Sequence, residues 1–175
     1  QNLMDVLFAS HEAHSGKDFW NRSAANIAAP VALHVLYSEP LERKTLGVVR
    51  EKLRTLSKTA DEMRCTLHRR DPATNLPQVH PEILHAAESF LAGEERMRSG
   101  IQATAESMFG VFADPLVAKN TQSSDFRLGD LMAHERPVTL YLQPPPGDTP
   151  RLMPLMRLIV DQIGRALMES QTHDS

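Results

Sequence analysis

The chain has 175 residues, of which 41% are hydrophobic and only 5% aromatic, and its formal net charge is -3 at pH 7. This charge is too small to indicate a nucleic-acid or membrane partner for the molecule as a whole. The single cysteine, Cys65, excludes an internal disulfide and a zinc site built on cysteines. Leu, Ala, Val and eight Met carry the apolar content, which favours an all-α fold. A start at Gln1 suggests a piece of a longer protein.

Helical spacing of apolar residues dominates the first half of the chain. A short helix over 2–9 needs tertiary support, and 11–16 read as a loop. A long, mostly buried helix begins at Lys17, and Pro30 inside it predicts a kink or break near Ala29. Thr45 is expected to cap the next helix. A further helix is predicted over 59–68, with Leu67 facing inward.

The second half begins with a proline-rich loop over 71–81. Pro81 then starts a helix over 82–91, and Gly93 ends it. The following helix, from Glu94, carries small residues such as Gly100 and Ala103 that let a neighbouring backbone come close, so we expect it at the centre of the bundle. Asp114 before Pro115 predicts the start of another short helix.

The character of the chain changes near its C-terminus. The sequence VTLYL, residues 138–142, predicts a strand, and Asp148 or Thr149 is expected to cap a final helix. A lone strand cannot satisfy its own backbone hydrogen bonds, so we expect it to be poorly ordered or to pair with another molecule. The resulting expectation is a multi-helix bundle with one short C-terminal strand and helix, divided into 1–16, 17–135, 136–169 and 170–175.

No reaction centre emerges from the sequence. Gly16-Lys17 lacks the flanking residues of a phosphate-binding loop, and the strand 138–142 ends in Gln-Pro rather than in acids that bind Mg²⁺. The histidines do not show zinc-protease spacing, and we interpret Cys65 as a structural thiol. We therefore predict no catalytic, cofactor-binding or metal-binding residue. Five histidines lie in predicted loops or next to them, and His173 lies in a C-terminal tail; the five are His11, His14, His68, His80 and His85.

One segment stands out by charge. Residues 43–70 hold nine Lys or Arg against three Asp or Glu, a local net charge of +6 that leaves -9 for the rest. These cations could neutralise phosphates, or they could simply solvate the outer face of helices packed through their leucines. No aromatic residue lies among them to stack on bases. The candidate DNA-binding or partner-binding residues are Arg50, Lys52, Arg54, Lys58, Arg64, Arg69 and Arg70.

Three stretches together resemble a known family. They are DFWNRSAANIAAPVALHVLYSE (18–39), ERMRSGIQATAESMFGVFADPLVAKNTQSSDFRLGDLM (95–132) and ERPVTLYLQPPPGDTPRLMPLMRLIVDQI (135–163). The first two are similar to the all-α domain of type IV secretion coupling proteins, the TraG/TraD class of conjugation ATPases. The third resembles the strand and helix by which that chain returns to its nucleotide-binding domain. Pro30 and the 71–81 loop depart from the family pattern.

The resemblance implies a role without a reaction centre. In this family the all-α domain is inserted in a RecA-like ATPase between the Walker A and Walker B motifs, so a fragment spanning it lacks both, although the parent is an ATPase. The implied partners are a relaxase or other relaxosome protein, with DNA as a further ligand. The implied setting is the cytoplasmic end of a homo-hexamer anchored in the bacterial inner membrane, with no membrane contact by this fragment. The alternative is a structural module that shapes the hexamer and contacts neighbouring subunits.

Overall fold

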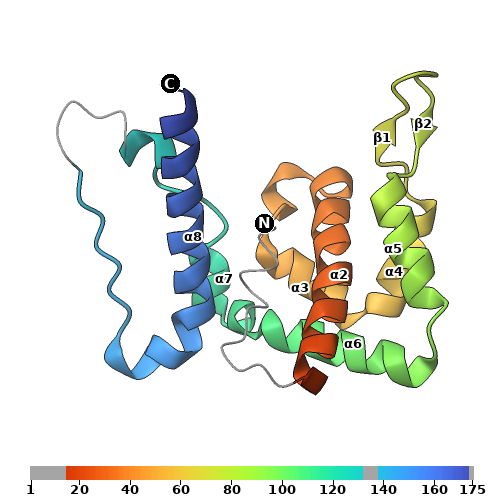
Figure 1. Ribbon diagram of the computed structural model, residues 1–175, viewed down its shortest axis with the longest axis horizontal. Coiled ribbons are helices and arrows are strands. Elements are labelled where there is room, and N and C mark those ends of the chain that lie inside the picture. Colours follow the sequence, from red (N-terminus) through yellow and green to blue (C-terminus); the bar gives the residue numbers. More distant parts are fainter. Residues whose placement is uncertain (1–14, 132–137, 174–175) are drawn as a thin grey trace. The chain divides into compact units, whose positions relative to one another are not determined.

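A computed structural model describes residues 15–131 and 138–173, which divide into two compact units, one ending at Gln122 and one starting at Ser123. The boundary between the two units lies at residues 122 and 123, earlier than the boundary at residues 135 and 136 that the sequence suggested. The other domain limits, at residues 16 and 169, stay predictions. The all-α prediction is confirmed (Figure 1). The first unit comprises α2 (Ser15–Ser38), η1 (Leu41–Arg43), α3 (Leu46–Arg54), α4 (Leu56–Cys65), β1 (Arg69–Arg70), β2 (Pro77–Gln78), α5 (Pro81–Leu91), α6 (Glu95–Met108), η2 (Gly110–Ala113) and α7 (Pro115–Asn120).

Helix α2 is the centre of this unit. It packs against α3, α5 and α6, and Figure 1 shows α6 crossing its N-terminal end. Its buried apolar side chains recur at the spacing of one helix face; they are Ala24, Ile27, Ala28, Val31 and Val35. The expected break at Pro30 is wrong, because α2 runs without interruption from Ser15 to Ser38. Pro30 removes one backbone donor, and packing on three neighbours sustains the helix.

The helix starts follow their local signals. The Thr45 hydroxyl accepts a hydrogen bond from the Val48 amide at 3.3 Å, and the Asp114 carboxylate accepts one from Leu116 at 2.7 Å. Helix α4, however, begins at Leu56 and ends at Cys65 instead of spanning 59–68. Thr59 lies inside α4, where its hydroxyl donates to the Lys52 carbonyl at 2.8 Å. Leu67 therefore lies beyond the helix and is exposed, contrary to its predicted inward position.

A β-hairpin occupies the segment expected to be a loop. Strands β1 and β2 pair antiparallel, with Arg69 opposite Gln78 and Arg70 opposite Pro77. The Asp71 carboxylate accepts from the amides of Ala73 at 2.9 Å and Thr74 at 2.8 Å, an Asx turn that tightens the tip. Asn75 adopts a positive φ of 57°, which Asn tolerates better than most residues. The hairpin projects beyond the adjoining ends of α4 and α5 (Figure 1).

Helix α6 is peripheral rather than central. Ala105 is its buried residue, whereas Ala103 is exposed. Gly100 faces α2, and a Cβ there would lie 2.6 Å from Cζ3 of Trp20. The small residues of α6 therefore allow one close approach, to Trp20, and the predicted central place belongs to α2.

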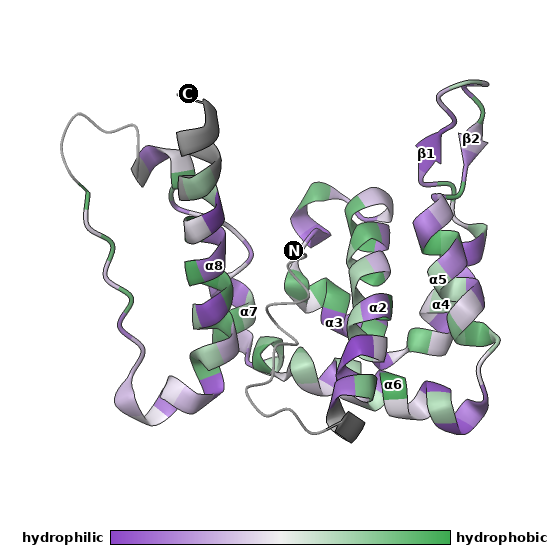
Figure 2. Ribbon diagram, in the orientation of Figure 1, coloured by the Kyte–Doolittle hydropathy of each residue, from purple (hydrophilic) through white to green (hydrophobic). Residues whose placement is uncertain are grey.

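The second unit contains η3 (Leu128–Leu131), η4 (Pro146–Asp148) and α8 (Thr149–His173), and α8 contacts both η3 and η4. Residues 138–145 form no regular element, so the predicted strand over 138–142 is absent from the described chain. Tyr141 is 76% exposed, and no other strand is described in this unit to pair with the segment. Figure 2 shows hydrophobic and hydrophilic residues alternating along α8. Among the helices described, none combines the length and apolarity that crossing a bilayer requires.

Candidate docking surfaces

The cations of α3 lie close to carboxylates. Arg50 and Arg54 both approach Glu106 of α6, at 3.9 and 3.5 Å. Lys52 lies 2.7 Å from Glu62 of α4 and 3.8 Å from Glu39 of α2. Their charge is thus largely balanced within the helical unit, which weakens any attraction for a polyanion.

The cations of α4 are also near acids. Arg64 lies 3.7 Å from Asp61. The hydrogen bond from Lys52 lowers the pKa of Glu62, and the charge of Lys58 lowers it further. The structure therefore does not gather the helical candidates into an unbalanced basic patch.

Arg69 and Arg70 differ from the other five candidates because they lie on β1. Arg70 donates a hydrogen bond to the Asn75 carbonyl at 3.0 Å across the hairpin. The Nε atom of Arg69 is buried and has no hydrogen-bond partner among the described residues. Figure 2 shows β1 as hydrophilic, while Leu76 near the tip is 65% exposed. The hairpin thus presents basic and apolar side chains together.

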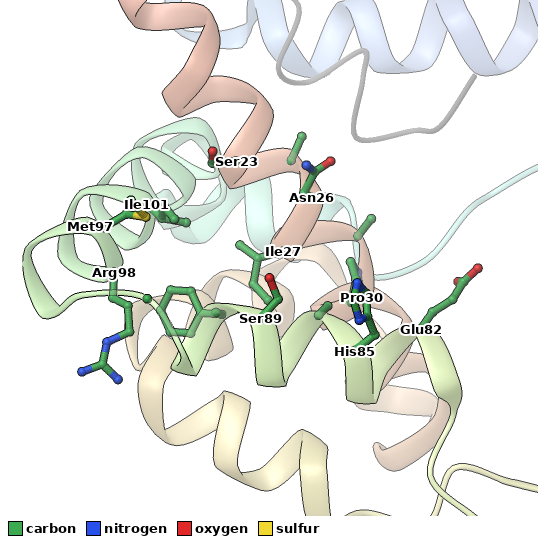
Figure 3. A pocket seen from close by; sticks show the side chains of 15 residues that line it. Ser23, Asn26, Ile27, Pro30, Glu82, His85, Ser89, Met97, Arg98 and Ile101 are labelled. Carbon is green, nitrogen blue, oxygen red and sulfur yellow. The ribbon is translucent and has the colours of Figure 1, made fainter.

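A groove of about 580 Å³ opens between α2, α5 and the start of α6 (Figure 3). One wall is a face of α2 with small side chains, and the opposite wall is a face of α5. Ile27 and Phe90, both nearly buried, reach it from the core. Polar and charged side chains and the rim of the groove are provided by Ser23, Asn26, Pro30, Glu82, His85, Ser89, Met97 and Arg98.

The groove carries opposite charges at its two ends. Glu82 belongs to the first turn of α5, whereas Arg98 lies in the first turn of α6, and Figure 3 shows them on opposite sides of the opening. The stem of Arg98 crosses Gly93, where an added Cβ would lie 3.7 Å from the Arg98 Cγ. Its buried Nε finds no hydrogen-bond partner in the described part of the chain. A buried donor left unpaired is costly.

Three histidines connect α2 to the base of the hairpin. The His80 amide donates to Nδ1 of His68 at 3.3 Å, which fixes the proton of neutral His68 on Nε2. That Nε2 then donates to Nδ1 of His34 at 2.8 Å. The ring of Tyr37 lies 6.1 Å from that of His68 and 5.8 Å from that of His80. The chain of contacts holds the hairpin against α2.

Burial governs the titration of this chain of histidines. Desolvation, followed by the nearby His68, lowers the pKa of His34 to about 4. Desolvation also lowers the pKa of His68. Both rings are therefore neutral at pH 7. The described residues contain no group of three His, Cys, Asp or Glu side chains arranged to hold a metal ion.

Comparison with known proteins gives the family. A model of the family described as "Type IV secretory system Conjugative DNA transfer" matches residues 1–174. A "Conjugal transfer protein TraG" from Escherichia coli is 30% identical over 179 residues, covering 100% of this chain and 27% of the relative. A second protein of that name from Escherichia coli is 31% identical over 171 residues, covering 97% of the chain and 26% of the relative.

The chain belongs to the conjugative DNA-transfer family of type IV secretion. The resemblance inferred from the three stretches is thereby confirmed. The chain spans about a quarter of the length of these TraG relatives. No solved structure matches it significantly.

Several features of this family member were not accessible from its sequence. The groove depends on how α2, α5 and α6 pack, and of the histidines considered beforehand only His85 lines it. His34 was not predicted to be a notable residue, because a single histidine on the apolar face of a helix has no sequence pattern that indicates its partner. Cys65, interpreted as a structural thiol, is exposed and free, so it does not contribute to the core. His11 and His14 lie outside the described residues.

Proposed function

We propose that the helical unit is the substrate-recognition part of a conjugative coupling protein, engaging a relaxase or another relaxosome protein before transfer. The observation that carries this proposal is the open groove of α2, α5 and α6 in a member of the conjugative DNA-transfer family. A groove with an apolar floor and a few polar groups is the usual form of a binding site.

Protein is favoured over DNA as the principal ligand. The α3 cations lie near Glu39, Glu62 and Glu106, and the groove itself carries one acid and one arginine. Phosphate binding needs unbalanced positive charge. Arg69 and Arg70 on the hairpin are the part of the basic set best placed to meet a phosphate backbone.

The setting of this recognition unit follows the resemblance. The parent would be an ATPase that forms a hexamer anchored in the bacterial inner membrane, with this unit on the cytoplasmic side. In this arrangement the unit selects cargo and the ATPase domain supplies the work, so the isolated chain does not turn over ATP.

A structural role is the alternative, and one observation favours it. Leu36, Tyr37 and Leu41, at the end of α2 and in η1, expose 53%, 46% and 81% of their surface. Such a cluster is typical of a surface that meets another protein. If it joins neighbouring subunits, the unit would shape the hexamer without contacting cargo.

Titration of the purified chain distinguishes these roles. The ligands are the relaxase of the same conjugative system and labelled single-stranded and double-stranded DNA, each at two salt concentrations. Saturable binding of the relaxase supports recognition. Loss of DNA binding in Arg69→Glu/Arg70→Glu, with Arg50→Glu/Arg54→Glu as the comparison, would assign DNA contact to the hairpin. Concentration-dependent self-association without binding of either ligand would favour the structural role.

A further inference from the structure

We infer that the groove between α2 and α5 receives an amphipathic helix of the protein substrate, with an acidic residue toward Arg98 and a basic residue toward Glu82. This inference rests on the proposed recognition function and names the chemical class of its ligand. The groove is distinct from the basic residues that the sequence had singled out.

The walls of the groove have the form that accepts a helix. On α2 the lining residues Ser23, Asn26 and Pro30 recur at helical spacing, and on α5 Glu82, His85 and Ser89 do the same. Two parallel rows of side chains form a trough rather than a closed cavity. The α2 row is short: it spans the eight residues from Ser23 to Pro30, about 10 Å at a rise of 1.5 Å per residue, or two helical turns.

The floor supplies the apolar contact that such a helix needs. Ile27 and Phe90 keep 4% and 6% of their surface exposed, while Met97 at the rim is 42% exposed. Methionine adapts its shape to different partners. A ligand helix would place one or two apolar side chains here, about one turn from each of its charged residues.

Polar groups that could form hydrogen bonds with a ligand lie within the same groove. Arg98 lines one end of the groove, where its guanidinium would give a ligand carboxylate a charge-assisted hydrogen bond. Pro30 has no amide hydrogen to donate to the Asn26 carbonyl, so this carbonyl lacks its usual helical donor. The Ser23 and Ser89 hydroxyls add donors along the two walls.

Charge complementarity decides between a protein ligand and a nucleic acid. The charged groups that line the groove are Glu82 and Arg98, which balance each other. A phosphate backbone would meet Glu82 unfavourably and gain from only one arginine. A helix with an acid near one end and a base near the other satisfies both charges and presents its apolar face to the floor.

The test uses the full chain and fluorescent peptides of about 18 residues, long enough for two helical turns to form, that tile the relaxase. Ser89→Trp fills the groove from an exposed position on α5, and Arg98→Glu reverses the charge at one end. The matched controls are Ser57→Trp on α4 and Arg96→Glu on α6, both exposed and outside the groove. Affinity is measured by fluorescence anisotropy, and folding of each variant is checked by circular dichroism.

We expect peptides with the acid-apolar-base pattern to bind, and Ser89→Trp and Arg98→Glu to weaken them by about tenfold or more. The control variants should bind normally. Arg98→Glu should recover affinity for a peptide whose acid is replaced by Lys, a result that a merely structural effect would not produce.

Four outcomes would overturn the inference. Peptide binding that is equal in the wild type and both groove variants would place recognition elsewhere, leaving the proposed function intact. If the whole relaxase binds but none of its peptides does, recognition would also lie outside the groove and the proposed function would remain. Failure of the relaxase itself to bind would remove the proposed function and, with it, this inference. Competition between DNA and groove-bound peptide would show that the groove takes nucleic acid instead.

Discussion

Gly100 of α6 lies directly against the indole of Trp20 on α2, so that a Cβ at Gly100 would come within 2.6 Å of Cζ3 and 2.8 Å of Cη2. No methyl group fits at that separation. The pair therefore sets how closely α6 approaches α2. Since both helices contribute to the groove, the pair also sets its shape.

Replacing Gly100 by Leu should destabilise the chain by about 1–3 kcal/mol through overpacking against Trp20. The same change at the exposed Ala103 should stay within about 0.5 kcal/mol of the wild type. Urea denaturation followed by circular dichroism measures both. Equal losses at the two positions would show that α6 is packed differently from the structure.

The neutral His34–His68 pair predicts loss of stability in acid. The unfolded chain protonates His34 near its ordinary pKa of 6.5, whereas the folded chain does so only at about 4. Between these values the unfolded state binds more protons, so stability is full above pH 6.5 and falls as the pH drops toward 4.

The contribution of His34 is isolated by comparing variants over this pH range. The unfolding free energy of His34→Gln should fall less steeply with decreasing pH than that of the wild type. His85→Gln, at an exposed position on α5, should keep the wild-type slope. An unchanged slope in His34→Gln would mean that the buried pair is not the cause.

Lys52 should keep the pKa of Glu62 below its usual value. Its Nζ lies 2.7 Å from the Glu62 carboxylate, and this hydrogen bond is the largest cause of the lowered pKa. Lys52→Gln should raise the pKa of Glu62, read by NMR titration, and lower stability by about 1 kcal/mol or less, as is usual for partly exposed pairs. A pKa of Glu62 that does not move would contradict the pairing.

The tip of the hairpin depends on Asp71. Its carboxylate accepts from the amides of Ala73 and Thr74, and these bonds lower its pKa. Asp71→Ala should speed amide exchange at Ala73 and Thr74 without a measurable change in global stability. Asn75→Gly should preserve the turn, because glycine accepts the positive φ without strain. Slow exchange that persists in Asp71→Ala would show that the backbone alone maintains the turn.

Signals within one or two turns of chain were sufficient to predict part of this fold. The caps at Thr45 and Asp114 and the starts at Pro81 and Pro115 depend on adjacent residues, and each lies as expected. The expected strand over 138–142 failed because β propensity needs a partner strand, and none is described beside it. The hairpin was not predicted, because the prolines of residues 71–81 indicated an irregular loop. In the structure the Asp71 carboxylate forms a tight turn at the tip, which allows β1 and β2 to pair.

The candidate site was harder to predict, because it is made by packing. The small residues of α6 indicated one close approach but not which helix would make it, and the structure assigns that contact to Trp20. The basic segment was visible as a local charge excess, yet its acids Glu39 and Glu106 come from outside the segment. Glu82 and Arg98 face a common groove only once α2, α5 and α6 have packed.

Amide hydrogen exchange of the full chain, with and without the relaxase, tests the central claim most directly. If the relaxase docks in the groove, its binding should slow amide exchange in two segments: residues 23–30 of α2, and residues 82–93, which comprise most of α5 and the turn after it. Exchange in α4 should not change. Relaxase binding with protection confined to α3, α4 or the hairpin, and none along the groove, would contradict the account.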